Sequence, residues 1–232
     1  QKQKIKNFTT LKLRANQLIF MKNLQYVDIF IVQTLHMQKE LEAFLFKAEK
    51  LDQNIPISTV PLDNRKSNKQ RREISGHRLK LFYPARSYPH KNHKLLFEGF
   101  SEIKRKYPSY ELILTLENDE VLDERIVSTG ELSNSKIQRL MDQDDVALVF
   151  PSKKESFGIP LIEALAMDIP ILVADLPYAR ELCGNSAIYF DPNKVDSLIS
   201  AIDKIKVNQE VIREKKTLDL YETTAAHILT LI

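Results

Sequence analysis

Between residues 79 and 205, short apolar runs alternate with longer stretches in which apolar residues recur at helical spacing. The run Val146-Ala-Leu-Val-Phe150 contains no polar residue. A strand without polar residues is typical of a parallel sheet that is covered on both faces. The repeated strand–helix units therefore predict an α/β fold built on a Rossmann-like, doubly wound parallel sheet.

The apolar runs and the helical stretches give the approximate order of the elements. Strands are expected at residues 79–83, 111–116, 146–150, 170–174 and 187–190. Helices are expected at residues 94–106, 133–141, 159–166, 178–182 and 195–205, and Ser133 is a candidate N-cap. Ligands of such sheets bind at the carboxyl ends of the strands. We therefore expect the segments 84–91, 117–132 and 151–157 to form one functional rim.

The first 63 residues differ from the rest of the chain. They contain two β-rich runs, 27–32 and 57–62, and one helical pattern, 37–50. The next stretch is polar, lacks apolar periodicity and carries five basic residues: Arg65, Lys66, Lys69, Arg71 and Arg72. We therefore expect a separate α/β part at 1–63, a linker at 64–76 and a larger domain beyond it. The basic run could contact anionic lipid or be a solvated linker.

The segment after Phe150 combines a polar loop with the start of a helix. Pro160 fits the first helical turn, where its missing N–H has no intrahelical partner, and Gly158 allows a ligand close to the backbone. The start of a helix favours a phosphate or another anion. Glu155 and Glu163 flank this start and suit a ligand with both hydroxyls and phosphates, although a solvated loop glutamate and a helix-dipole partner explain the same spacing.

This whole segment, Pro151-Ser-Lys-Lys-Glu-Ser-Phe-Gly-Ile-Pro-Leu-Ile-Glu-Ala164, resembles the Glu-x7-Glu signature of glycosyltransferase family 4, the retaining GT-B enzymes also called glycosyl transferases group 1. The segment Tyr83-Pro-Ala-Arg-Ser-Tyr-Pro-His-Lys-Asn92 resembles the family's Arg-x4-Lys segment, with alanine where glycine is commoner before the arginine. The resemblance extends from residue 79 to the C-terminus.

The resemblance implies a role for several residues. Arg86 and Lys91, which alone would pass for surface charges, would hold the donor diphosphate as its negative charge grows. Glu155 would position the sugar and would be the third catalytic residue beside these two cations. Glu163 would bind the ribose hydroxyls. The remaining donor-binding residues would be Ser156, Phe157, Gly158 and Ile159, with Gly130, Glu131 and Leu132 near the nucleobase. The family mechanism needs no metal ion and no other cofactor.

The same resemblance divides the chain further. Residues 77–217 would be the C-terminal, nucleotide-sugar-binding GT-B domain, and residues 218–232 a helix that crosses back toward the N-terminal part. Residues 1–63 resemble only the end of the acceptor-side domain. The chain is therefore expected to be a fragment, or to be completed by a partner chain or a homo-oligomer.

The expected function is transfer of a hexose-type sugar from a nucleotide-diphosphate donor to a glycan or lipid-linked acceptor, with retention, in surface polysaccharide or glycolipid synthesis. One alternative is a GT-B-fold sugar-nucleotide epimerase. Another is a non-catalytic nucleotide-sugar-binding module that needs a partner chain.

Composition and smaller motifs narrow the remaining classes. With 34 basic and 31 acidic residues the net charge is only +3, which disfavours nucleic acid as a partner. No apolar run is long enough to span a bilayer, so we expect a cytoplasmic protein with peripheral contact at the inner membrane face. Asp142-Gln-Asp144 is expected to be a solvated helix end, His90 and His93 lack further metal ligands, and Cys183 is expected to be buried.

Overall fold

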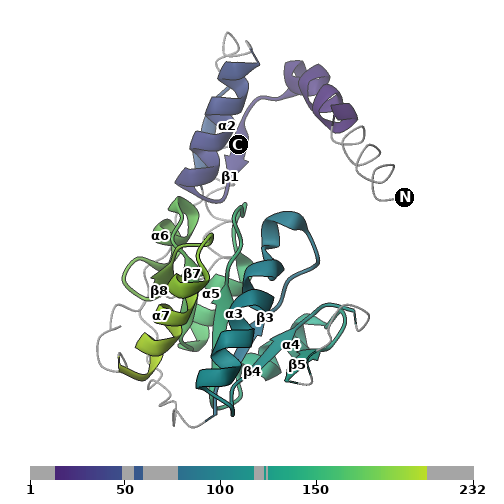
Figure 1. Ribbon diagram of the computed structural model, residues 1–232. Coiled ribbons are helices and arrows are strands. Elements are labelled where there is room, and N and C mark those ends of the chain that lie inside the picture. Colours follow the sequence, from purple (N-terminus) through teal and green to yellow (C-terminus); the bar gives the residue numbers. More distant parts are fainter. Residues whose placement is uncertain (1–13, 49–54, 60–77, 118–122, 124, 208–232) are drawn as a thin grey trace. The chain divides into compact units, whose positions relative to one another are not determined.

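The computed structural model describes residues 14–48, 55–59, 78–117, 123 and 125–207 (Figure 1). The chain divides into two compact units, Gln1–Thr59 and Val60–Ile232, and each is described by itself. The linker expected at 64–76 and the helix expected at 218–232 lie outside the described residues.

The larger unit is built on a six-stranded sheet with the order β5-β4-β3-β6-β7-β8. Every neighbouring pair of strands is parallel. The strands are β3 (Lys80–Tyr83), β4 (Glu111–Leu114), β5 (Ile126–Ser128), β6 (Val146–Phe150), β7 (Ile171–Ala174) and β8 (Ile188–Phe190). The chain leaves β3 toward one edge and returns at β6 toward the other, so β3 and β6 flank the switch point of the sheet.

Helices cover both faces of this sheet. They are α3 (His93–Lys106), α4 (Asn134–Met141), α5 (Ile159–Met167), α6 (Pro177–Cys183) and α7 (Val195–Val207), with a 3-10 turn η2 (Pro89–Lys91) before α3. Helices α3 and α7 pack side by side in front of the sheet in Figure 1. Right-handed crossovers place α4, α5 and α6 on the opposite face. The doubly wound α/β fold predicted from the sequence is therefore confirmed.

The core lies where these layers meet the central strands. All five residues of β6 are buried, which agrees with a strand that carries no polar side chain. Phe82 of β3 and Phe100 of α3 are also fully buried. Gly99 allows close packing of α3 against α7, because a Cβ there would lie 2.9 Å from the side chain of Leu198. Apolar burial of this kind is the main favourable term in folding.

The structure corrects the sequence prediction at three places. The segment 117–132, expected as a rim loop, contains the edge strand β5, whose three residues are too few for a periodic signal. Ser133 stands at the N-cap position of α4, but its hydroxyl contacts Ser135 instead of capping the helix. Residues 14–23 form a helix that the sequence analysis did not predict.

The smaller unit contains the helix at 14–23, the 3-10 turn η1 (Leu24–Tyr26), β1 (Phe30–Val32), α2 (Leu35–Lys47) and β2 (Ile57–Thr59). Strands β1 and β2 pair in parallel. The hydroxyl of Thr34 caps α2 by accepting a hydrogen bond from the amide of Met37 at 3.1 Å. Leu18, Tyr26 and Phe46 are exposed. Completion of this part by a partner chain or a second copy stays a prediction.

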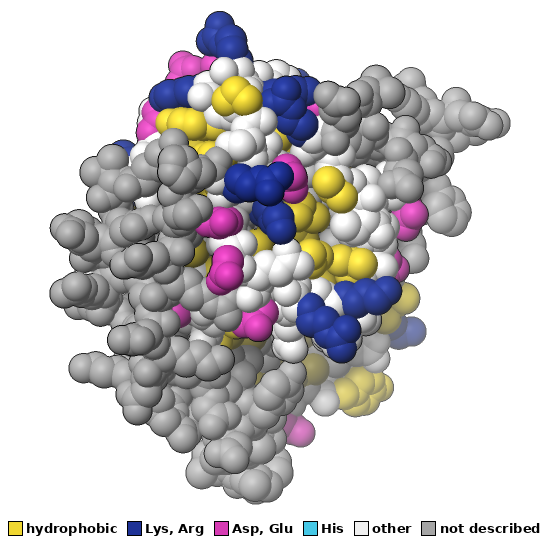
Figure 2. Space-filling view, turned by 90° about the horizontal axis from the view of Figure 1, so that it is seen from below, with side chains coloured by type: hydrophobic (Ala, Val, Ile, Leu, Met, Phe, Trp, Pro, Cys, Tyr) yellow, Lys and Arg dark blue, Asp and Glu magenta, His cyan; other side chains and the backbone are white. Residues whose placement is uncertain are grey.

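The described surface mixes charges of both signs. On the face shown in Figure 2, basic side chains lie close to acidic and apolar ones. Lys104 pairs with Asp123, and Lys106 pairs with Asp203 at 2.7 Å. None of the helices within the described ranges is both long enough and apolar enough to cross a bilayer.

Asn92 links three loops at the carboxyl end of the sheet. It joins η2 to α3 in the left-handed conformation, with a φ of 59°. Its side-chain amide donates hydrogen bonds to the carbonyl of Pro192 at 2.8 Å and to that of Pro151 at 3.3 Å. Asparagine tolerates the left-handed conformation better than other non-glycine residues. One residue therefore sets the turn and fixes the loops after β6 and β8.

Asn92→Ala is expected to lower the free energy of unfolding by about 2–3 kcal/mol, because it loses both hydrogen bonds and strains the left-handed backbone. Asn92→Gly also loses the hydrogen bonds but tolerates the left-handed backbone, a gain that the greater freedom of glycine in the unfolded chain partly offsets, and it is expected to lose about 1–2 kcal/mol. Urea unfolding of both variants measures the difference. Equal losses would show that the strain of alanine at this position does not exceed the entropy cost of glycine.

Candidate functional site

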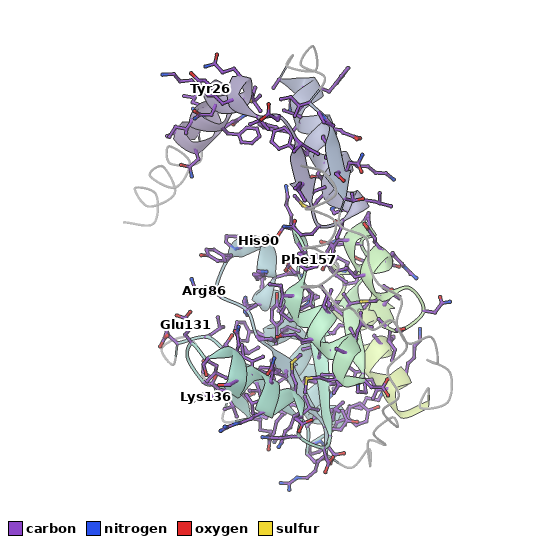
Figure 3. All side chains as sticks on the ribbon, turned by 180° about the vertical axis from the view of Figure 1, so that it is seen from behind. Tyr26, Arg86, His90, Glu131, Lys136 and Phe157 are labelled. Atoms are coloured by element: carbon purple, nitrogen blue, oxygen red, sulfur yellow. The ribbon has the colours of Figure 1, made fainter. Side chains whose placement is uncertain are left out.

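The loops that follow β3 and β6 meet at the switch point of the sheet. The amide of Lys153 donates a hydrogen bond to the carbonyl of His90 at 2.7 Å. The hydroxyl of Ser152, which is fully buried, lies 3.3 Å from the same carbonyl. His90 and Phe157 lie at the same end of the larger unit in Figure 3. Two segments about sixty residues apart in the sequence thus form one surface.

Lys91 and Glu155 form an ion pair between these loops. The Nζ of Lys91 lies 2.5 Å from the Oε1 of Glu155, and the two side chains are only 18% and 10% exposed. The Nζ also lies 5.9 Å from the centre of the Phe150 ring. A pair so far removed from water interacts more strongly than a surface pair, and it also loses more hydration. The structure therefore brings together two of the three residues to which the resemblance gives a catalytic role.

Two buried tyrosines lie beside this pair, and the sequence analysis assigned them no role. The Tyr83 hydroxyl donates to the carbonyl of Lys91 at 2.9 Å, and the Tyr178 hydroxyl donates to the carbonyl of Ser152 at 2.7 Å. Burial first, and the Glu155 carboxylate second, raise the pKa of both phenols. Both phenols therefore stay protonated, and each remains a donor, throughout the working pH range.

Helix α5 begins beside the ion pair. Gly158 precedes it with a φ of 71°, and no side chain caps the helix start. A Cβ on Gly158 would lie 3.2 Å from Leu161 and 3.3 Å from Leu182, so both the backbone and the packing require glycine. Ser156 and Ile159 are exposed, and Phe157 is half-buried. Gly158 itself is buried, and the exposed neighbours on either side are Ser156 and Ile159.

Arg86 and Glu131 form a second, exposed ion pair on the same rim. Their side chains are 67% and 70% exposed, and Figure 3 shows them on neighbouring loops. Gly130 turns the chain between β5 and α4 with a φ of 68°, and its amide donates to the carbonyl of Leu116 at 2.8 Å. Leu132 follows in the same loop and is half-buried. An exposed pair of this kind contributes little to stability, because water and salt screen it.

Glu163 lies apart from both ion pairs, in a groove between α4 and α5. The groove has a volume of about 460 Å³ and is lined by Ser135, Gln138, Arg139, Asp142, Glu163, Ala166 and Met167. Burial raises the pKa of Glu163, and a hydrogen bond from Gln138 opposes this effect. The groove includes neither Lys91 nor Glu155. The ligand roles of all these residues stay predictions.

The two histidines considered as metal ligands differ in their exposure. His90 is exposed, whereas His93 is buried, and burial lowers the pKa of both imidazoles. Residues 142–144 are exposed at the end of α4, as expected. Cys183 is buried. In the part of the chain that the structure describes, no group of three or more His, Cys, Asp or Glu side chains is arranged to hold a metal ion.

Residues 64–218 match the protein family described as glycosyl transferases group 1. The O-antigen chain mannosyltransferase RfbU of Salmonella typhimurium is 33% identical over 133 residues, which are 52% of this chain and 36% of that protein. The serotype-specific mannosyltransferase WbdA of Escherichia coli is 28% identical over 129 residues, 50% of this chain and 16% of that protein. The chain thus covers well under half of each of these relatives.

Solved structures share the fold. The pneumococcal O-GlcNAc transferase GtfA, in complex with UDP and GlcNAc, aligns with a TM-score of 0.65 at 19% identity, over 89% of this chain and 46% of that one. Sucrose-phosphate synthase from Thermosynechococcus elongatus aligns with a TM-score of 0.62 at 16% identity, over 88% of this chain and 57% of that one. The family and the GT-B fold expected from the sequence are confirmed.

Lys91→Met is expected to lower the free energy of unfolding by about 3 kcal/mol, because it leaves the Glu155 carboxylate buried without its partner. Adding Glu155→Gln should recover most of this loss. Arg86→Met and Glu131→Gln provide the matched control, since that pair is exposed and each change should cost much less than Lys91→Met. Urea unfolding measures all variants, and additive losses from Lys91→Met and Glu155→Gln would contradict a coupled pair.

Glu163→Gln is expected to raise Tm at neutral pH, because the raised pKa means that the folded state disfavours the ionised carboxylate. This penalty is present above the folded pKa and disappears as the pH falls below the unfolded value of about 4.3. The gain in Tm should therefore shrink between neutral pH and pH 4. A gain that does not change with pH would show that ionisation is not its cause.

Proposed function

Since the chain belongs to the glycosyl transferases group 1 family, we propose that its larger unit binds a nucleoside-diphosphate sugar and contributes to its transfer onto a glycan or lipid-linked acceptor. The observation that carries the proposal is the buried Lys91–Glu155 pair beside the start of α5, at the switch point of the sheet. A cation, a carboxylate and a helix start at one place suit a ligand that has phosphates and hydroxyls.

The sugar in this proposal is mannose. RfbU and WbdA, which resemble half of the chain, are both named as mannosyltransferases, and RfbU is named for the O-antigen chain. The reaction would thus extend a surface polysaccharide, at the cytoplasmic face of the membrane. The smaller unit would belong to the acceptor side.

The bond between the anomeric carbon and the diphosphate breaks in the proposed step, and its electron pair leaves with the diphosphate. An acceptor hydroxyl forms the new bond on the same face of the sugar and gives its proton to the departing diphosphate, so that the configuration is retained. Lys91 can donate to the departing diphosphate while it keeps Glu155, because an ammonium group has three N–H donors. Arg86 would add charge, and the amides at the start of α5 would complete the cradle. Because these groups supply the positive charge, the step needs no metal ion.

The groove between α4 and α5 would hold the nucleoside. Glu163 would accept hydrogen bonds from the ribose hydroxyls, which favour its ionised form and so offset the effect of burial. The loop at Gly130, Glu131 and Leu132 would lie near the base. Ser156 and Phe157 would contact the sugar or the diphosphate beside α5.

Loss of either part of the site is expected to weaken nucleotide binding. The double variant Lys91→Met/Glu155→Gln removes the charged pair without leaving a lone buried charge, and Glu163→Ala removes the carboxylate in the groove. Each should raise the Kd for GDP or UDP about 10- to 100-fold, the equivalent of one charge-assisted hydrogen bond. Titration calorimetry measures binding, and a thermal-shift panel of nucleotide sugars identifies the donor.

Lys106→Ala is the matched control, because it removes a lysine at the far end of α3, in an ion pair with Asp203. Its Kd should equal that of the wild type. Wild-type affinity in the site variants would overturn the proposed site. Conversion of the nucleotide sugar without an acceptor would instead identify an epimerase, and binding without turnover on any acceptor would identify a binding module.

A further inference from the structure

We propose that Tyr83 and Tyr178 are positioning residues whose hydroxyls fix the two loops that carry Lys91 and Glu155. The inference deepens the proposed function and rests on it, since it assigns these loops to the donor diphosphate. It concerns the backbone of the loops, which the ion pair alone does not fix.

Tyr83 acts on the loop that contains Lys91. It is the last residue of β3 and is fully buried, so its position is set by the sheet. Its ring packs 5.0 Å from the ring of His93 and 5.5 Å, edge to face, from the ring of Phe150. From this fixed position its hydroxyl donates to the carbonyl of Lys91 at 2.9 Å. The hydrogen bond therefore ties the end of η2 to the strand that precedes it.

Tyr178 acts in the same way on the other loop. It lies in α6 with only 2% of its surface exposed, and its hydroxyl donates to the carbonyl of Ser152 at 2.7 Å. Ser152 precedes Glu155 by three residues and touches the carbonyl of His90 from the facing loop. The hydrogen bond therefore fixes the first turn of the loop that carries Glu155.

The ring alone does not explain why tyrosine occupies these two positions, because phenylalanine has the same ring and would fill the same space. Burying a hydroxyl is unfavourable unless it finds a partner, and here each partner is a loop carbonyl. The negative charge of the Glu155 carboxylate also raises the pKa of both hydroxyls, as expected for groups that lie near it. Two neutral donors thus lie near one ion pair. One holds the loop that carries Lys91, and the other holds the loop that carries Glu155.

Tyr189 provides a matched control. Its hydroxyl also donates to a backbone carbonyl, that of Gly184, at 2.6 Å, and it lies 3.4 Å from the carbonyl of Ala179 in α6. Gly184 follows α6, and Tyr189 belongs to the edge strand β8, so this hydrogen bond involves neither the loop after β3 nor the loop after β6. Tyr189→Phe deletes the same group from the same kind of bond, but away from Lys91 and Glu155.

The test compares Tyr83→Phe, Tyr178→Phe and Tyr189→Phe in the full chain. In the absence of nucleotide, hydrogen exchange should speed up in residues 84–92 of Tyr83→Phe and in residues 151–158 of Tyr178→Phe. The Kd for GDP or UDP, measured well below Tm, should rise about three- to tenfold in both variants, the equivalent of one neutral hydrogen bond. Tyr189→Phe should lower Tm by a similar amount and leave the Kd and the exchange of both loops unchanged.

A double-mutant cycle tests whether Tyr83 acts through Lys91. In the Lys91→Met/Glu155→Gln background, Tyr83→Phe should have no further effect on the Kd. A full further effect would overturn the assignment, as would unchanged loop exchange, or faster exchange with an unchanged Kd.

If the wild-type chain binds neither GDP nor UDP, the proposed function fails, and the donor role of these tyrosines fails with it. If the wild type binds and the tyrosine variants match Tyr189→Phe, the positioning role alone fails.

Discussion

The pairing of β3 with β6 is the interaction on which the rest of the larger unit depends. The register Lys80↔Val146 to Phe82↔Leu148 places the carboxyl ends of β3 and β6 within about one residue of the same level of the sheet. The helices that follow these two strands lie on opposite faces of the sheet. No crossover connection therefore fills the space between the loops after β3 and β6. The space at the switch point is thus a consequence of topology, and it allows polar residues of the two loops to meet, as Lys91 and Glu155 do.

A polar centre placed there has to be satisfied from within the protein. The Lys91–Glu155 pair loses hydration by burial, and it regains free energy only if its geometry is fixed and the neighbouring polar groups are paired. The two loops accordingly exchange hydrogen bonds with each other and with buried hydroxyls. Such a preorganised pair suits a site that must stabilise charge without reorganising.

Much of this could be predicted from the sequence. The polar-free run Val146–Phe150 and the spacing of apolar residues gave the doubly wound sheet, because burial on both faces leaves a direct trace in composition. Lys91 and Glu155 were placed on one rim for the same topological reason. Strand β5 was missed because a three-residue edge strand with one exposed residue shows no apolar run in the sequence. The role of Tyr83 was missed because its partner is a backbone carbonyl, which no side-chain pattern reveals.

The two cations of the rim differ in a way that only the structure shows. Lys91 is fixed in a buried pair, whereas Arg86 pairs with an exposed glutamate and is itself largely exposed. Exchanging the glutamate for a phosphate would cost Arg86 little, because exposed pairs are weak and screened by salt. Lys91 is already fixed in the position in which the proposed function has it meet the diphosphate. The Arg-x4-Lys spacing therefore combines a cation in a buried pair with a cation in an exposed pair. A stronger ion pair between Arg86 and Glu131 would do little to fix the loops that carry Lys91 and Glu155.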